Sequence, residues 1–180
     1  ILIEPTGIRQ TIRGNFQVWE YRQTQAQMYG LDLDANLSLT DNVRFVHQFS
    51  LVKGYDKTSN EPLISMPAAN TLNSLVYTNP NFNNISIAIQ SNYVFRQNEF
   101  PNTNFEVVLP DSIQTVDIST PPSGYHLLNL NITAAVRPDM QVGLYVNNLL
   151  NTSYRNYLNR LRYYADDVGR NITLQLKYNY

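Results

Sequence analysis

The chain has 180 residues, no cysteine and a formal net charge of -1, and its length is sufficient for one domain with its own core. The near-neutral charge predicts no nucleic-acid partner, and the lack of cysteine excludes disulfide frameworks and thiolate metal sites. The chain contains no run of about 18 apolar residues, so we predict no membrane-spanning helix. Charged residues make up only 15% of the chain, so its polar surface is mostly uncharged.

The alternation of apolar and polar residues predicts an all-β, antiparallel fold of about eight strands. In chain order these are a short remnant at 1–5 and seven good strands at 26–39, 43–53, 70–78, 84–95, 125–136, 141–147 and 169–180. In 26–39 every second residue from Tyr29 to Leu39 is apolar, and Asp32 and Asp34 share the opposite face. The ThrAspAsn turn at 40–42 predicts a hairpin with 43–53.

The connections between the predicted strands alternate in length. The short connections are 40–42, 79–83 and 137–140, and the long ones are 54–69, 96–124 and 148–168. All short turns therefore lie at one end of the sheet, as in outer-membrane barrels. A soluble barrel or sandwich shows the same alternation of residues, so periodicity alone does not separate the two classes.

The C-terminal stretch from Val146 to Tyr180 resembles the closing segment of TonB-dependent outer-membrane receptors. In that family an Asn-Leu pair ends the penultimate strand, a loop with Tyr-Arg follows, and Gly-Arg-Asn opens the last strand. The matching residues are Asn148, Leu149, Tyr154, Arg155, Gly169, Arg170 and Asn171. The N-terminal ILIEPTG and TIRGNFQVWEYRQTQAQMYGLDLD are similar to a stretch where such receptors leave one strand, cross a long loop and enter the next.

The resemblance implies that residues 1–180 are a transmembrane β-barrel segment, the last third of a barrel of about 22 strands, without the plug, the TonB-contacting box and the earlier strands. It also implies that Tyr178 and Tyr180 belong to a C-terminal assembly signal read by the barrel-assembly machinery. The implied location is the outer membrane of a Gram-negative bacterium, in contact with its lipid.

By the same resemblance, the function is TonB-coupled uptake of a scarce small-molecule ligand, with a siderophore or another metal chelate as the leading expectation. The TonB complex would act through the plug. We expect no enzymatic activity and no cofactor. Two alternatives stay open: a self-contained eight-stranded barrel or sandwich that binds ligands, and an all-β hydrolase that uses Asp32 and Asp34.

Six residues are predicted to contact a ligand from a loop or from the lumen: Trp19, Tyr21, Asp32, Asp34, Arg155 and Tyr157. Aromatic residues on exposed loops are typical recognition residues, and arginine beside tyrosine offers cation-π and anion contacts. Each has a structural alternative. Asp32 and Asp34 could face a plug or lumen water, and the loop from Tyr154 to Arg170 could be a rim in which Arg155 or Arg170 pairs with Asp166 or Asp167.

Two isolated histidines, His47 and His126, lie on apolar phases of their strands. Metal ligation would require further ligands that converge in space, whereas a position near a membrane interface or another surface would not. We therefore predict no metal site, and the absence of a nucleophile elbow or a metalloprotease motif predicts no catalytic site.

Overall fold

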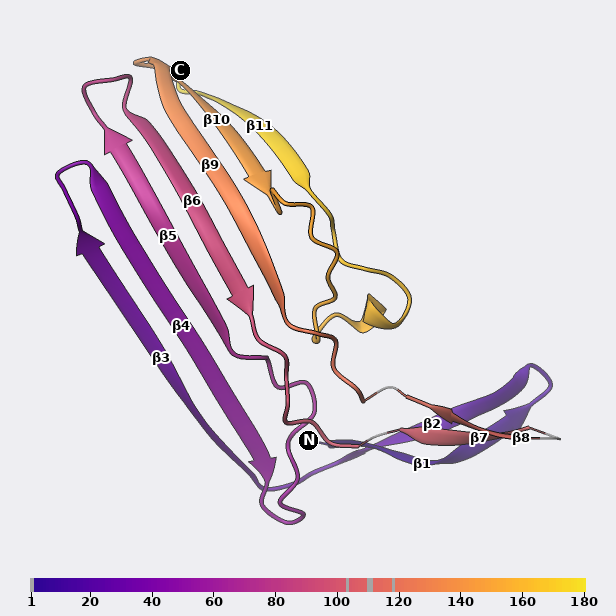
Figure 1. The fold of residues 1–180 in the computed structure, drawn as a ribbon. Helices are drawn as coiled ribbons and strands as arrows, with labels where there is room; N and C mark the ends of the chain where they lie inside the picture. The colour runs from indigo at the N-terminus through magenta and orange to yellow at the C-terminus, as the bar shows by residue number, and fades with distance from the viewer. Residues whose placement is uncertain (1, 103, 110–111, 118) are drawn as a thin grey trace.

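The computed structural model describes residues 2–102, 104–109, 112–117 and 119–180, and these residues form eleven strands and one short 3-10 helix (Figure 1). The strands are β1 (Leu2–Thr11), β2 (Gly14–Arg22), β3 (Ala26–Ser38), β4 (Val43–Asp56), β5 (Asn70–Asn79), β6 (Ile85–Val94), β7 (Phe105–Leu109), β8 (Ser112–Val116), β9 (Tyr125–Arg137), β10 (Met140–Asn147) and β11 (Asn171–Tyr178). The helix η1 (Arg160–Tyr163) lies between β10 and β11. Among the described residues, no helix has the length and apolar character needed to cross a membrane.

Seven strands form one antiparallel sheet in the order β11-β10-β9-β6-β5-β4-β3 (Figure 1). Neighbours in the sheet are neighbours in the chain except at β6 and β9, between which the β7–β8 hairpin is inserted. Each of the seven good strands predicted from the sequence overlaps one of these strands, so the antiparallel all-β prediction is confirmed. We call the end with the short connections the turn end and the opposite end the loop end.

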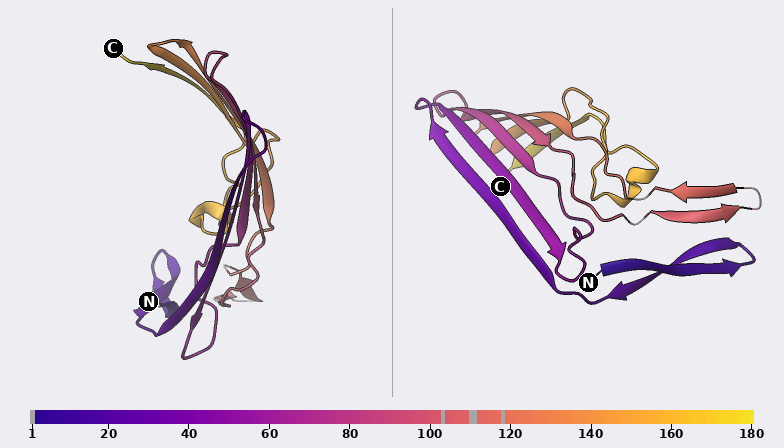
Figure 2. Two further views of the ribbon diagram at one scale, coloured as in Figure 1. Left: turned by 90° about the vertical axis from the view of Figure 1, so that its left-hand side faces the viewer. Right: turned by 60° about the horizontal axis from the view of Figure 1, so that its bottom comes forward.

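The register carries the apolar alternation from strand to strand. Leu33 is opposite Phe49, and Leu75 is opposite Ile89, so one face of the sheet is apolar from β3 to β11 and the other is polar. The sheet is curved, and the loop with η1 lies inside the curve (Figure 2). That loop packs on the polar face through Tyr125, so the concave face is the polar one and the convex face is apolar.

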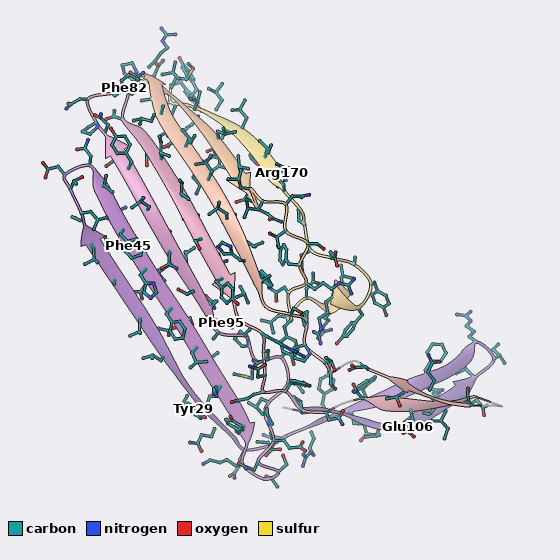
Figure 3. All side chains as sticks on the ribbon, in the orientation of Figure 1. Tyr29, Phe45, Phe82, Phe95, Glu106 and Arg170 are labelled. Atoms are coloured by element: carbon teal, nitrogen blue, oxygen red, sulfur yellow. The ribbon has the colours of Figure 1, made fainter. Side chains whose placement is uncertain are left out.

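The seven-stranded sheet is a single layer. In the described part of the chain, side chains project from both faces and no second sheet covers either of them (Figure 3), and the buried hydrophobic core residues are Met66 and Val146. Leu174, on the convex face, is 80% exposed. The chain is long enough for a core of its own, but the apolar residues of the sheet are spread over one open face.

Aromatic side chains mark both ends of the sheet. Phe82 lies in the connection at the turn end, whereas Tyr29 and Phe95 lie toward the loop end (Figure 3). Tyr93 and Phe95 make an edge-to-face contact with ring centroids 4.8 Å apart. Aromatic bands above and below an apolar zone are typical of strands that cross a bilayer.

Two hairpins that extend beyond the loop end were not predicted from the sequence. The remnant at 1–5 is part of the ten-residue strand β1, which pairs with β2, and the loop at 96–124 contains the β7–β8 hairpin. Trp19 and Tyr21 therefore lie on a strand, not in an irregular loop. A two-stranded ribbon outside a sheet need not bury one face, so it lacks the alternation on which the prediction depends.

Candidate ligand-binding surfaces of the concave face and the rim

Asp32 and Asp34 lie on the concave face of β3, as the strand alternation predicts. Gln48 on β4 donates a hydrogen bond from Nε2 to Asp34 Oδ1 at 2.8 Å. The two carboxylates line a shallow depression of about 460 Å³ together with Gln48, Phe49, Ser50, Asn70, Leu72 and Asn92. Beside Phe49 and Leu72, the lining offers carboxylates, amides and a hydroxyl, which can bind polar or cationic groups.

The connection from β10 to β11 begins at Asn148, whose backbone has a left-handed φ of 52°. The Asn148 side chain is buried and bonds both the carbonyl oxygen and the amide of Thr152 at 2.8 Å. Asn151 accepts a bond from the Arg170 amide at 2.9 Å, and a Cβ on Gly169 would lie 2.9 Å from the same oxygen. The Asn and Gly-Arg positions of the sequence resemblance thus start and close this connection.

The middle of this connection, residues 153–167, is here called the rim loop. Its own polar side chains hold it together. Arg155 Nε lies 2.6 Å from Asp166 Oδ1, and Ser153 also donates to Asp166. These two donors hold the pKa of the Asp166 carboxyl below its usual value. The Arg162 guanidinium lies 4.6 Å and 4.5 Å from the ring centroids of Tyr157 and Tyr163. The rim alternative named Arg155 or Arg170 as the partner of Asp166 or Asp167, and of these four combinations the structure contains the Arg155–Asp166 pair.

The rim loop packs against the concave face at the loop end, where the rings of Tyr125 and Tyr154 lie 4.5 Å apart. Arg155 and Tyr157 line one cavity of about 120 Å³ with residues of three other segments, among them Phe95 and Gln97. Burial there raises the pKa of the Tyr157 phenol, so it is a neutral hydrogen-bonding group at neutral pH. The structure therefore brings two of the six predicted ligand residues together.

The remaining predicted residues occupy other places. Trp19 and Tyr21 are two positions apart on β2 and so share one side of the β1–β2 hairpin, with Tyr21 largely exposed. Asp32 and Asp34 line the concave depression, whereas Arg155 and Tyr157 lie at the rim. The six residues are thus divided among three surfaces: hairpin, wall and rim.

Two polar clusters at the loop end of β4 have no counterpart in the sequence prediction. Lys53 Nζ and Tyr55 OH, on the convex face, both donate to the Glu99 carboxylate. Asp56, on the concave face, is only 1% exposed and accepts a bond from Thr24 Oγ1 at 2.7 Å. The sequence carried one sign of the first cluster: Lys53 interrupts the apolar phase of its strand.

His47 and His126 are on the convex face, where each has a neighbour on an adjacent strand. His47 Nδ1 lies 2.7 Å from Asn73 Oδ1, and His126 Nε2 lies 2.8 Å from Ser91 Oγ. These contacts satisfy one ring nitrogen of each histidine on an otherwise apolar face. The two histidines are on β4 and β9, with β5 and β6 between them.

The last strand is an edge of the sheet. β11 pairs with β10 through eight residues, and Tyr178 is opposite Met140 on the convex face. Tyr178 and Tyr180 are both exposed. At the other edge is β3, a strand of 13 residues that pairs with β4 on one side and has no neighbouring strand on its other side in the described sheet.

Comparison with known proteins gives matches only at the level of structure. Neither family models nor curated protein sequences match the chain. The copper transporter OprC matches over 100% of this chain and 27% of its own length, with a TM-score of 0.77 and 15% identity. The ferric-catecholate import receptor Fiu from K12 E. coli, in its closed form, matches over 98% of this chain and 24% of its own, with a TM-score of 0.59 and 14% identity.

The chain thus spans about a quarter of the length of the solved structures that it resembles. Identities of 15% and 14% show a shared fold. Both neighbours are TonB-dependent receptors, the family to which the terminal segments showed a resemblance. The predicted fold class is confirmed: the chain is an antiparallel all-β sheet with the fold of part of a TonB-dependent receptor barrel.

Proposed function

We propose that the chain forms part of an outer-membrane importer that takes up a scarce ligand, with a siderophore or another metal chelate as the first candidate. The observation that carries this proposal is the single-layer sheet with an apolar convex face and a polar concave face, on a fold shared along the whole chain with import proteins. A water-soluble protein would cover an apolar face of this size.

The two faces divide the work of such an importer. The convex face would contact lipid, since side chains such as Leu33 and Leu174 are exposed and aromatic residues such as Tyr29 and Phe82 lie toward the two ends of the sheet. The concave face would line the lumen, where Asp32 and Asp34 offer carboxylates to a polar or cationic part of the ligand. The short connections would face the periplasm and the long ones the outside.

Ligand capture would begin at the loop end. Tyr21 on the β1–β2 hairpin is exposed, and Arg155 and Tyr157 line the cavity at the rim. Trp19 would act beside Tyr21 from the same side of its strand. Binding to Arg155 by an anionic group would compete with Asp166, which lies 2.6 Å away. Uncharged or cationic chelates would bind there without breaking that pair.

Three further parts of the proposal involve other components of the importer and its assembly. Energy would come from the TonB complex through the plug of the importer. The β11 edge with Tyr178 and Tyr180 would be the strand that the barrel-assembly machinery handles. The open edges of β3 and β11 would pair with other strands of the same barrel, because an unpaired edge is a template for association.

The direct test is uptake by cells. Deleting the gene that carries this chain is expected to abolish TonB-dependent accumulation of at least one probe from a panel of iron-55-labelled ferric chelates and copper-64. A strain without TonB is the matched control. Unchanged accumulation of every probe in the deletion strain would contradict the import proposal.

A second candidate function, binding by a self-contained small barrel, requires β3 and β11 to pair with each other. In the described sheet they are opposite edges. An antibody against residues 155–168 separates the candidates on a blot of fractionated envelopes. A band several times heavier than 20.7 kDa in the outer membrane supports the importer, and a band at 20.7 kDa supports the small barrel.

A further inference from the structure

The loop end of β4 extends beyond its neighbour in the sheet. β4 continues to Asp56, whereas β5 begins at Asn70, which is opposite Ser50. From 51 to 56 the strand therefore has no β5 partner, and residues 61–63 pair with it instead, through the Tyr55–Pro62 bridge and the backbone bonds Leu63 N to Gly54 O at 2.8 Å and Asp56 N to Glu61 O at 2.9 Å. Side chains on the two faces of this short segment contact chain segments that lead to or from two different hairpins.

The concave side of this segment contacts the exit of the β1–β2 hairpin. Asp56 Oδ1 accepts bonds from Thr24 Oγ1 at 2.7 Å and from the Thr58 amide at 2.8 Å. Asp56 Oδ2 has no hydrogen-bond donor among the described residues and faces Arg22 Nη2, the end of β2, at 3.6 Å. The Lys57 amide also donates to the Gln25 carbonyl at 2.8 Å. A carboxylate that is 1% exposed thus joins the base of this hairpin to β4.

The convex side of the same segment contacts the base of the β7–β8 hairpin. Lys53 and Tyr55 both donate to Glu99, which precedes β7 in the chain. Gln97 fixes the same stretch from the side, because its Nε2 donates to the carbonyls of Met66 at 2.9 Å and Pro67 at 3.1 Å. The Glu99 amide donates in turn to Gln97 Oε1 at 3.0 Å. The chain therefore crosses from β6 past β5 to β4 before the hairpin begins.

We infer that residues 53–56 of β4 are a common anchor that positions two hairpins at the loop end, β1–β2 through Asp56 and β7–β8 through Glu99, one from each face of the strand. Only the link from these hairpins to ligand capture rests on the proposed import function; the anchor itself rests on the contacts of Asp56 and Glu99. Asp56 and Glu99 are positioning residues: they place hairpins, including the one with Trp19 and Tyr21, and do not themselves contact the ligand.

The two attachments are chemically separate, and this allows a selective test. Asp56→Asn keeps the acceptor for Thr24 but removes the charge that faces Arg22, and Glu99→Gln removes the charge that faces Lys53. Asp41→Asn is the matched control, because it makes the same change in an exposed turn at the other end of β4. Lys53→Met tests the Glu99 attachment from its other partner.

The experiment measures spin-label distances in the intact protein that carries this chain, reconstituted in lipid nanodiscs on a background without other cysteines. One label pair joins Arg13, in the turn of β1–β2, to Leu150 on the sheet side of the rim, and a second joins Gln114 on β8 to Leu150. We expect narrow distributions for both pairs in the wild type. Asp56→Asn should cause loss of the narrow peak only for the Arg13 pair.

Glu99→Gln and Lys53→Met should cause the same loss only for the Gln114 pair, and Asp41→Asn should change neither. Unchanged distributions in the anchor variants, or equal broadening of both pairs by each variant, would overturn the inference. These distances need no ligand, so they decide the anchor even if the uptake panel finds no imported probe.

The effect of the anchor on ligand capture is measured separately, by uptake in cells that express each variant. For any probe that the wild type imports, each anchor variant should raise the half-saturating concentration by about three- to tenfold, because an unpositioned hairpin must be ordered on binding. Maximal uptake should be unchanged. Equal half-saturation in wild type and variants would show that the anchored hairpins do not capture that probe.

Discussion

The sheet and the rim of this protein obtain their order in opposite ways. The sheet, β3 to β6 and β9 to β11, is regular and continuous, but few of its side chains are fully buried. The rim loop is irregular, yet its polar side chains are joined by short contacts such as Arg155–Asp166 and Asn159–Asp167. The sheet therefore depends on its surroundings to cover it, whereas the rim is stabilised by contacts inside the chain.

The largest expected difference between sheet and rim concerns the isolated chain. We expect residues 1–180 alone to aggregate in buffer and to become monodisperse only in detergent, because the convex face and two sheet edges are open. Light scattering coupled to size-exclusion chromatography measures this directly. A monodisperse monomer without detergent would mean that the apolar face is covered within the chain.

Within the sheet, the two faces should respond differently to charge. Ile89→Arg, on the convex face of β6, should lower the free energy of unfolding in lipid vesicles by about 2–4 kcal/mol, the usual penalty for a lipid-facing arginine. Ala88→Arg is the matched control on the concave face and should cost much less. Chemical unfolding of the intact protein in vesicles compares them, and equal penalties would contradict the assignment of the faces.

At the border between sheet and rim, Asn148 combines a left-handed backbone with a buried, doubly bonded side chain. Asn148→Ala should lower the free energy of unfolding by about 2–3 kcal/mol, from lost hydrogen bonds and an unfavourable φ. Asn148→Gly should recover about 1 kcal/mol, since glycine tolerates that φ. Equal losses in both variants would mean that the backbone conformation contributes nothing.

Acid should release the β7–β8 hairpin from the sheet. Lys53 and Tyr55, the latter stacked on Tyr29, face the Glu99 carboxylate, and their hydrogen bonds hold the pKa of Glu99 below its ordinary value. The attachment is therefore complete at neutral pH and is lost as the pH falls below about 4. The Gln114–Leu150 distance should broaden there in the wild type, whereas Glu99→Gln should show no such transition.

The smallest effect is expected for the exposed ion pair of the rim. Arg155 and Asp166 are 43% and 45% exposed, so a double-mutant cycle with Arg155→Ala and Asp166→Asn should give a coupling of about 0.2–1 kcal/mol. Ser153 shares Asp166 and contributes to the single-variant effects. A coupling several times larger would indicate that the rim loop carries more of the stability than its exposure suggests.

The difference between the regions also decided what could be predicted. The strands of the sheet were predicted because each alternates apolar and polar residues, as Leu33 and Asp34 do. The β1–β2 and β7–β8 hairpins were not, because neither has a face that must be buried. Sequence reasoning paired Arg155 with Asp166 as one of several options, but the anchor on β4 joins residues 32 and 46 positions apart, which no local pattern indicates.

By itself, the sequence determined the strand period, the polarity of the two faces and the short turns at one end, because these depend on neighbouring residues and on the backbone geometry of a strand. Only the tertiary structure decided that the sheet is a single curved layer, that β6 pairs with β9 across an inserted hairpin, and that Asp56 and Glu99 meet opposite faces of one strand end. Those features arise from contacts between distant residues, which are selected by register and side-chain reach, not by local propensity.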